Sequence, residues 1–325
     1  MSRKILVIVE HNEGNIKNVS REILSFCSHF GEKRGYVVEA LLYGNDLSEN
    51  LYKQIGESGI ECITYINDSR LKYHNPDIIN PTLIKMIDET MPEFVFFGNT
   101  SIAKDLAPWL AQHFSSQMIS DVIDIDFSDS QIKFKRPIYG GRVIEKIKVV
   151  NKDLLFVTIR PNSLGLQEGK SKEIFTRGIN LEDKPLRYIV KDVVSKEKIE
   201  LPINEAEVIV AGGRAFKSEE DFSILHELAD IIDATVGASR PIIDMGIKRR
   251  SLQIGQSGKS VSPRLIFVCG VSGQIQFVAG IGNAKTVISI NRDSGATIFK
   301  TSDYGIVGDV YKIIPIISKR LKKSI

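Results

Sequence analysis

Short apolar runs alternate with amphipathic stretches through the first half of the chain, and this pattern predicts alternating strands and helices. Buried strands are predicted over 5–9, 37–42 and 94–97, and amphipathic helices over 19–30, 81–90 and 103–114. Strands that alternate with helices build βαβ units, in which the strands run parallel and the helices cover the sheet. The first half therefore predicts an α/β domain with a mostly parallel sheet flanked by helices.

The pattern of apolar and polar residues changes after residue 121. Strands are predicted over 132–134, 143–150 and 154–159, separated by turn-forming residues such as Gly140 and Gly141, which indicates a partly antiparallel extension of the sheet. Residues 161–207 are charged and punctuated by Gly and Pro, with one strand-like run over 188–194, as is typical of a connection between domains. We place the boundary between Glu197 and Asn204, giving domains 1–200 and 201–325.

The second domain returns to the α/β rhythm, and its strand ends carry residues suited to binding. The sequence predicts strands over 208–210, 265–269 and 287–290, and a helix over 219–232 with its apolar residues on one face. The first strand leads into Gly212, Gly213 and Arg214, the next into 270–273, and the last into Asn291. Open parallel sheets bind ligands at the carboxyl ends of their strands, so we expect a site there.

Composition and charge exclude several classes of protein. With 325 residues and 42% hydrophobic content, the chain can build two buried cores. A formal net charge of +3 gives no strong positive field, so we expect no nucleic-acid partner. The basic residues at 319–323 are interpreted as the solvated end of a helix.

Cysteine and histidine spacing excludes other sites. Cys27, Cys62 and Cys269 form no CxxC pair, which favours a reducing compartment over a disulfide framework. The five histidines lack metal-ligand spacing, so we expect no metal. The apolar run in MSRKILVIVE is too short for a signal peptide or a membrane span, so a cytoplasmic protein without membrane insertion is predicted.

Two familiar phosphate-binding motifs fail on spacing. The segment GQSGKS at 255–260 would need glycine at position 253 to be a P-loop, and that position is Gln253. The segment GIGNAK at 280–285 places Lys285 where a dinucleotide fingerprint needs its third glycine. Neither an NTPase nor a nicotinamide dehydrogenase is indicated.

Each glycine-rich strand end is weak evidence alone. Arg214 can fork onto a phosphate or a ring edge, although the same residues also suit an ordinary strand-to-helix turn. Ser272 and Gly273 precede a predicted helix over 274–279 and can present N–H groups to a pyrophosphate, although a simple helix cap fits equally well.

Taken together, the segments are more specific. They are GGRAFKS at 212–218, GASRP at 237–241, QIGQSGKSVSP at 253–263, GVSGQIQF at 270–277, INRD at 290–293 and DYGIVGD at 303–309. In this order they closely resemble the FAD-binding domain of electron-transfer flavoprotein alpha subunits. The resemblance continues more loosely in DLAPWLAQHF at 105–114, RPIYGG at 136–141 and VTIRP at 157–161.

The resemblance implies a doubly wound C-terminal domain that holds FAD. By motif, Arg240 matches an arginine beside the isoalloxazine, where a cation stabilises the reduced ring, and Ser257 matches the hydroxyl residue near flavin N5. Ser239 and 272–276 would line the ring and diphosphate, while Asn291 and Asp309 would reach the adenosine end. The residues so assigned to the cofactor are Arg214, Ser239, Arg240, Ile254, Gly255, Gln256, Ser257, Gly258, Ser272, Gly273, Gln274, Ile275, Gln276, Phe277, Asn291, Asp309 and Val310.

One position departs from the family. Many members carry histidine at the pyrimidine edge of the ring, and this chain has Phe277, which offers no hydrogen bond. The departure leaves open whether the chain serves a simple electron carrier or an electron-bifurcating complex.

The resemblance implies a heterodimer with a beta subunit that contacts the first domain. FAD would take electrons from flavoprotein dehydrogenases, such as the acyl-CoA dehydrogenases of fatty acid beta-oxidation, for a quinone reductase or another acceptor. The sequence shows no nucleophile at catalytic spacing from a general base. An electron carrier is therefore favoured over an enzyme with its own substrate. Two alternatives stay open: a nucleotide-binding regulatory module with this fold, and a stand-alone flavoenzyme.

Overall fold

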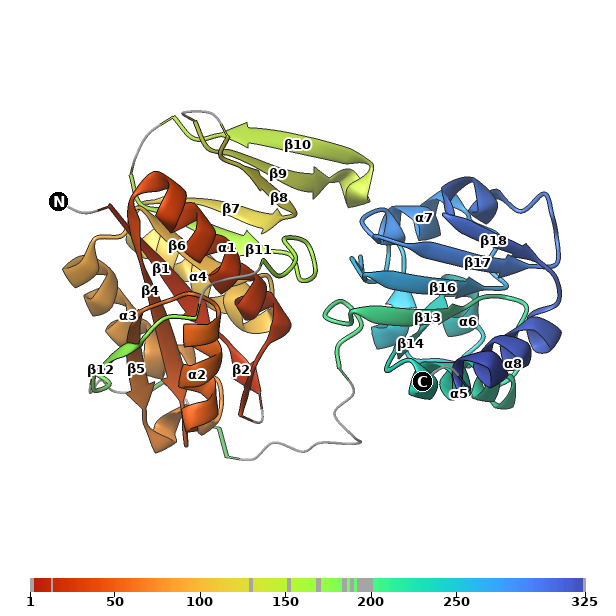
Figure 1. The fold of residues 1–325 in the computed structure, drawn as a ribbon, viewed down its shortest axis with the longest axis horizontal. Coiled ribbons are helices and arrows are strands. Elements are labelled where there is room, and N and C mark those ends of the chain that lie inside the picture. The colour runs from red at the N-terminus through yellow and green to blue at the C-terminus, as the bar shows by residue number, and fades with distance from the viewer. Residues whose placement is uncertain are drawn as a thin grey trace. The chain divides into compact units, whose positions relative to one another are not determined.

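The computed structural model describes residues 3–12, 14–128, 131–150, 153–167, 171–182, 186–187, 190–191 and 201–323. The chain forms two compact units, each built on its own sheet (Figure 1). The first unit comprises Met1–Arg136 and Glu145–Lys196, and the second comprises Pro137–Ile144 and Glu197–Ile325. The domain limits 1–200 and 201–325 stay a prediction, because residues 192–200 lie outside the described residues.

The first unit contains a seven-stranded sheet in which neighbouring strands run parallel. Its strands are β1 (Arg3–Val9), β4 (Tyr36–Gly44), β5 (Cys62–Asn67), β6 (Phe94–Gly98), β7 (Gln117–Val122), β11 (Leu155–Ile159) and β12 (Phe175–Gly178), in the order β12-β5-β4-β1-β6-β11-β7. The prediction of a mostly parallel α/β fold is confirmed.

Helices cover both faces of this sheet (Figure 1). They are α1 (Asn18–Arg34), α2 (Glu49–Glu57), α3 (Pro76–Thr90) and α4 (Ser101–His113), with a 3-10 turn η1 (Ser69–Lys72) before α3. Successive residues of a strand point to opposite faces, and β1 shows this clearly. Ile5 and Val7 pack in the core that contains residues of α1 and α2, whereas Leu6 and Ile8 pack in the core that contains residues of α3 and α4.

Five smaller strands lie outside this sheet, and the three that follow residue 121 match the change of pattern predicted there. They are β2 (His11–Asn12), β3 (Asn15–Ile16), β8 (Asp124–Asp126), β9 (Lys133–Ile138) and β10 (Val143–Lys148), with a 3-10 turn η2 (Tyr139–Gly141). β8 pairs antiparallel with β9 within a three-stranded sheet of order β10-β9-β8, so the partly antiparallel extension is confirmed.

The segment predicted to be a connection contains a strand instead. Phe175 to Gly178 forms β12, which pairs with β5 at the sheet edge. All four side chains are exposed, so the segment lacks the apolar alternation by which strands are recognised. The strand-like run predicted over 188–194 lies mostly outside the described residues, and Val190 and Lys191, which are described, form no strand.

The second unit contains a six-stranded parallel sheet in the order β15-β14-β13-β16-β17-β18. Its strands are β13 (Val208–Gly212), β14 (Thr235–Ser239), β15 (Gln253–Ile254), β16 (Leu265–Cys269), β17 (Val287–Asn291) and β18 (Tyr304–Val307). Its helical segments are η3 (Glu220–Phe222), α5 (Ser223–Ile231), α6 (Arg240–Asp244), η4 (Arg250–Leu252), α7 (Ile275–Ile281), η5 (Thr297–Thr301) and α8 (Val310–Leu321). Strand order reverses between β13 and β16, which confirms the doubly wound prediction.

Candidate functional site

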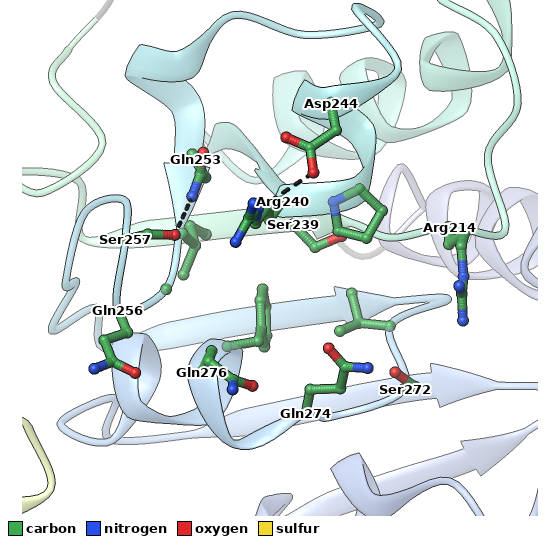
Figure 2. A pocket seen from close by; sticks show the side chains of 15 residues that line it. Arg214, Ser239, Arg240, Asp244, Gln253, Gln256, Ser257, Ser272, Gln274 and Gln276 are labelled. Atoms are coloured by element: carbon green, nitrogen blue, oxygen red, sulfur yellow. Dashed lines mark hydrogen bonds and ion pairs between the residues drawn. The ribbon is translucent and has the colours of Figure 1, made fainter. Parts of the chain in front are cut away.

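A cavity of about 670 Å³ opens at the carboxyl edge of the second sheet (Figure 2). Its volume lies within the range of small-molecule and cofactor sites. The residues that line it are Arg214, Ser239, Arg240, Pro241, Asp244, Gln253, Ile254, Gly255, Gln256, Ser257, Val271, Ser272, Gln274, Gln276 and Phe277. Arg214 and Gln256 lie at opposite ends, so the cavity is elongated (Figure 2).

The cavity lies where the strand order reverses. Beyond the ends of β13 and β16, the N–H of Gly213 donates to the carbonyl of Cys269 at 2.9 Å. A Cβ atom on Gly213 would lie 2.4 Å from the carbonyl oxygen of Gly270, so only glycine permits this approach. Burial raises the pKa of the Cys269 thiol to about 12, so this cysteine beside the site stays protonated near neutral pH.

A cation lies at the mouth of the cavity on α6. The Nε of Arg240 donates to Asp244 one helical turn later, at 3.2 Å. Both side chains are more than half exposed, so this ion pair adds little to stability. The terminal guanidinium nitrogens have no protein partner among the described residues, which leaves them able to contact a bound group.

The opposing loop, Gln253–Lys259, folds back on itself. The backbone N–H of Lys259 donates to the carbonyl of Gln253 at 2.7 Å, and that of Gly258 donates to the carbonyl of Gly255 at 2.9 Å. A Cβ atom on Gly258 would lie 2.3 Å from the Gln253 carbonyl oxygen. The N–H of Gln256 bonds to the carbonyl of Gln276 at 2.8 Å, so the loop is fixed against α7.

Side chains of Asn291 and Thr297 hold the loop that follows β16 in place. The side-chain amide of Asn291 donates to the carbonyl of Val271 at 2.9 Å. The Thr297 hydroxyl shares its one hydrogen between the carbonyls of Ser272, at 2.8 Å, and Gly273, at 2.9 Å. Gly273 has a positive φ of 87°, and a Cβ there would lie 2.2 Å from the Ile298 nitrogen. The loop can therefore present Ser272 and Gln274 in a fixed geometry.

The structure brings together most of the predicted binding residues. Those that line the cavity are Arg214, Ser239, Arg240, Ile254, Gly255, Gln256, Ser257, Ser272, Gln274, Gln276 and Phe277. Those that do not are Gly258, Gly273, Ile275, Asn291, Asp309 and Val310. Asp309 instead caps α8 by accepting from the Tyr311 N–H at 2.9 Å, and Val310 is buried in the core. The predicted adenosine end thus lacks direct support from this cavity.

Four lining residues were missing from the sequence-based set: Pro241, Asp244, Gln253 and Val271. Asp244 stands one helical turn after Arg240, so the (i, i+4) spacing of opposite charges was a usable signal. Gln253 carried no signal, because a polar residue in a glycine-rich segment is normally expected at the surface.

The donor set fits FAD. Two arginines, three serine hydroxyls and four glutamine amides line the cavity, and its single carboxylate, Asp244, is paired with Arg240. Cations and neutral donors suit a diphosphate and a ring with several acceptor atoms. Gly255 and Phe277 add apolar surface on which a flat ring can lie.

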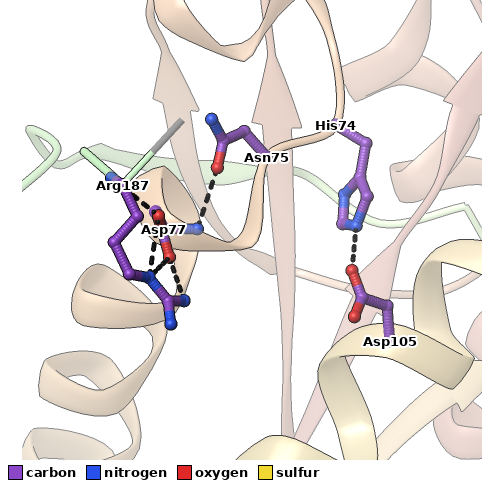
Figure 3. Close-up of polar contacts among 5 residues, drawn as sticks. All are labelled: His74, Asn75, Asp77, Asp105 and Arg187. Atoms are coloured by element: carbon purple, nitrogen blue, oxygen red, sulfur yellow. Dashed lines mark hydrogen bonds and ion pairs between the residues drawn. The ribbon is translucent and has the colours of Figure 1, made fainter. Parts of the chain in front are cut away.

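A smaller cavity, of about 280 Å³, opens at the carboxyl ends of β1 and β4 in the first unit. His11, Tyr43, Lys72, His74 and Asn75 are among its lining residues. The Nε2 of His74 lies 2.9 Å from a carboxylate oxygen of Asp105. The side-chain oxygen of Asn75 caps α3 by accepting from the Asp77 N–H at 3.0 Å (Figure 3). Burial lowers the pKa of His11, so this histidine is neutral at pH 7.

Arg187 attaches its segment to the start of α3. Its Nε donates to Asp77 at 2.9 Å, and this contact lowers the pKa of the Asp77 carboxyl (Figure 3). A lowered folded-state pKa adds stability above the ordinary aspartate pKa, and this stability is lost as pH falls through the folded-state value. We expect Arg187→Ala to lower the free energy of unfolding at pH 7 and to converge with the wild type once the pH falls below the folded-state pKa of Asp77.

Denaturant unfolding of both proteins at several pH values measures this difference. Arg177→Ala is the matched control, because Arg177 pairs with Glu89 at a longer distance, 3.4 Å, and both side chains are exposed. A loss of stability in Arg187→Ala that stays constant down to the acid range would contradict the assigned ion pair.

Two features are absent from the described part of the chain. Within it, no group of three or more His, Cys, Asp or Glu side chains is arranged to hold a metal ion. None of its helices is both long enough and apolar enough to span a membrane.

Comparison with known proteins identifies the family. The family described as the electron transfer flavoprotein domain matches residues 5–177, and the electron transfer flavoprotein FAD-binding domain matches residues 202–282. An electron transfer flavoprotein subunit alpha from Bacillus subtilis (strain 168) is 36% identical over 99% of this chain and 98% of its own length. Another, from Thermoanaerobacterium thermosaccharolyticum, is 31% identical over 99% of this chain and 98% of its own.

Other matches are more distant. The acryloyl-CoA reductase electron transfer subunit beta of Anaerotignum propionicum is 29% identical over 99% of this chain and 96% of its own. A solved thiamine diphosphate-dependent decarboxylase from Rhodococcus jostii RHA1 gives a TM-score of 0.23 at 12% identity, over 93% of this chain and 54% of its own, which is too low to support a conclusion. The first relatives match 99% of this chain, and all fifteen cavity residues lie within the matched FAD-binding domain. This chain therefore belongs to the electron-transfer flavoprotein alpha-subunit family, and its cofactor is FAD.

Proposed function

We propose that the cavity of the second unit is the FAD site, and that the chain joins a beta subunit to carry electrons from flavoprotein dehydrogenases to a quinone reductase or another acceptor. The observation that carries the proposal is the convergence of Arg240, Ser257 and Ser272 on one elongated cavity at the carboxyl edge of a doubly wound sheet. Three cysteines present as free thiols support the cytoplasmic location that forms part of the proposal.

Bound FAD supplies an isoalloxazine ring that takes up and releases electrons. Arg240 holds a positive charge beside that ring and so favours its reduced, more negative state. Ser257 presents a hydroxyl toward N5, while Arg214 and Ser272 bind the phosphates. These side chains bind and orient the cofactor, and none of them has to transfer a proton.

The lining residues favour a carrier over an enzyme with its own substrate. The cavity contains neither a histidine nor a cysteine, and its one carboxylate is paired with Arg240. The Arg240 side chain is 69% exposed, so a ring beside it would stay close to the protein surface. Electron exchange between proteins needs such access, whereas catalysis on a small substrate usually needs a closed site.

A beta subunit is supported by the relatives and by exposed apolar side chains. The relatives described above are all named as subunits. Tyr139, Val143 and Ile144, around β10, are 77%, 47% and 44% exposed. Apolar side chains clustered on an exposed segment are typical of a surface that a partner covers.

Amide hydrogen exchange tests the site. The chain is purified with its beta subunit, stripped of FAD, and compared with and without added FAD. We expect a flavin absorption spectrum and slower exchange over 253–259 and 271–277, while 9–12 and 43–45 beside the smaller cavity stay unchanged. Protection beside the smaller cavity alone would favour the nucleotide-binding alternative.

The direction of electron flow is tested separately. An acyl-CoA dehydrogenase with its substrate is expected to bleach the flavin absorbance of the heterodimer, and a quinone reductase is expected to restore it. Bleaching by a small-molecule substrate in the absence of any protein donor would instead support a stand-alone flavoenzyme.

A further inference from the structure

A buried amide lies behind the hydroxyl that faces the proposed flavin. Gln253, in β15, is only 5% exposed, yet its side chain lines the cavity. Its Nε2 donates to the Ser257 Oγ at 2.9 Å (Figure 2). Glutamine at this depth must have its amide group satisfied, because a buried polar group without a partner is costly. Ser257 is therefore the group that satisfies its amide nitrogen.

This hydrogen bond restricts what the Ser257 hydroxyl can do. A serine hydroxyl has one hydrogen to donate and two lone pairs that accept. Because an amide N–H already occupies one lone pair, the hydroxyl hydrogen must point away from Gln253. Among the described residues Ser257 has no second side-chain partner, and its side chain lines the cavity, so its hydrogen is free to point toward a group bound there.

The backbone keeps the two residues in this geometry. The Gln253 carbonyl accepts from the Lys259 N–H at 2.7 Å, and the Gly255 N–H donates to the Lys259 carbonyl at 3.1 Å. This pair of bonds closes the loop between the two side chains. The close approach of Gly258 to the Gln253 carbonyl, described above, leaves no room for a side chain at position 258, so this turn requires glycine. The main chain thus keeps Gln253 and Ser257 close to each other, and their contact does not depend on side-chain packing alone.

We propose that Gln253 is a positioning residue that fixes the Ser257 hydroxyl as a hydrogen-bond donor toward an acceptor atom of the bound flavin, N5 in the placement given above. The inference rests on the proposed function and extends it by one residue. Ser257 makes the contact, and Gln253 determines which end of the hydroxyl is presented. Without Gln253 the hydroxyl would rotate freely and would act as donor or acceptor.

A double-mutant cycle in the heterodimer tests this coupling. The two-electron midpoint potential of bound FAD is measured for the wild type, Ser257→Ala, Gln253→Met and the double variant. Methionine keeps the length of glutamine and removes both hydrogen-bonding groups. We expect the shift caused by Ser257→Ala to fall at least twofold in the Gln253→Met background, because residues that act as a unit are not additive. Equal shifts in both backgrounds, or no shift in the wild type, would overturn the inference.

A second variant tests the direction of the hydrogen bond and also guards against misfolding of Gln253→Met. In Gln253→Glu the carboxylate can only accept, so the Ser257 hydrogen turns toward residue 253 and leaves the flavin. The added charge is present in both members of the pair and cancels in the difference. We expect the Ser257→Ala shift to shrink here as well. If it keeps its wild-type size, the hydroxyl already faces residue 253 and the inference is wrong.

The same measurements separate this inference from the proposed function. FAD affinity is recorded for every variant, so that a change in cofactor binding is distinguished from a change in potential. If the wild-type heterodimer binds no FAD, the proposed function fails. If FAD binds throughout and the shifts are additive, only the role of Gln253 fails.

Discussion

Replacing Arg240 by alanine is expected to lower the two-electron midpoint potential of the bound FAD by about 30–60 mV and to weaken FAD binding. The reduced ring carries more negative charge than the oxidised ring, so a cation beside it stabilises the reduced state more. A hydrogen bond to a charged group contributes about 1.5–3 kcal/mol, and about 30 mV corresponds to 1.4 kcal/mol for two electrons. Redox titration of the heterodimer with dyes of known potential measures the shift.

Two matched variants separate the local charge from the general charge of the domain. Arg250→Ala removes an equal charge from an exposed position that does not line the cavity, and it is expected to leave the potential unchanged. Asp244→Asn removes the anion paired with Arg240 at 3.2 Å and is expected to shift the potential in the opposite direction by a smaller amount. Equal shifts for Arg240→Ala and Arg250→Ala would contradict the placement of Arg240 beside the ring.

The periodic elements of both units were predictable because their residues alternate or repeat on their own. β1, β6, β16 and β17 are short apolar runs, and residues 19–30, within α1, show helical spacing. β14 was not predicted, since Thr235–Ser239 contains glycine and alanine and has little apolar bulk. It becomes a strand because β13 and β15 pair with it on either side. Its structure comes from tertiary contacts that no local pattern records.

The residues of the candidate site also fall into those that the sequence predicted and those that only the structure shows. Arg240 and Ser257 were found because motif resemblance carries the side chains that would touch the cofactor. Gln253 was not found, because its importance lies in the 2.9 Å contact with Ser257 and in the loop that folds back to make it. Sequence supplies the groups that face the ligand more readily than the groups that hold them.

Asn291 has a structural role that its motif did not indicate. The family resemblance implied contact with the adenosine, which stays a prediction, and in the structure its side-chain amide donates to the Val271 carbonyl at 2.9 Å. Asn291 lies where it does because β17 ends there, and its hydrogen-bond partner comes from the neighbouring loop that follows β16. Its effect on the cofactor is therefore expected to pass through the loop that carries Ser272.

Phe277 combines the core and the cavity in one side chain. It is 6% exposed and packs with Ile254, Val271 and Ile281 in an apolar cluster, while it also lines the cavity. A phenyl ring in this place fills space and offers no hydrogen bond to a flavin carbonyl. The negative charge that builds up on the pyrimidine edge of the reduced ring consequently receives no donor from residue 277, which favours a lower potential than in relatives that carry histidine there.

Phe277→His is expected to raise the two-electron midpoint potential by about 30–60 mV, the equivalent of one hydrogen bond to a charged group. The rise should grow in the acid range, where the imidazole gains a positive charge, and burial in the apolar cluster places this below the ordinary histidine pKa. Phe277→Leu serves as the control: it is apolar and lacks a donor, so its potential should match the wild type at every pH. Thermal unfolding of each variant shows how far the core is weakened, since a polar ring in an apolar cluster is destabilising. A pH-independent shift shared by the histidine and leucine variants would mean that residue 277 acts on the flavin through packing alone.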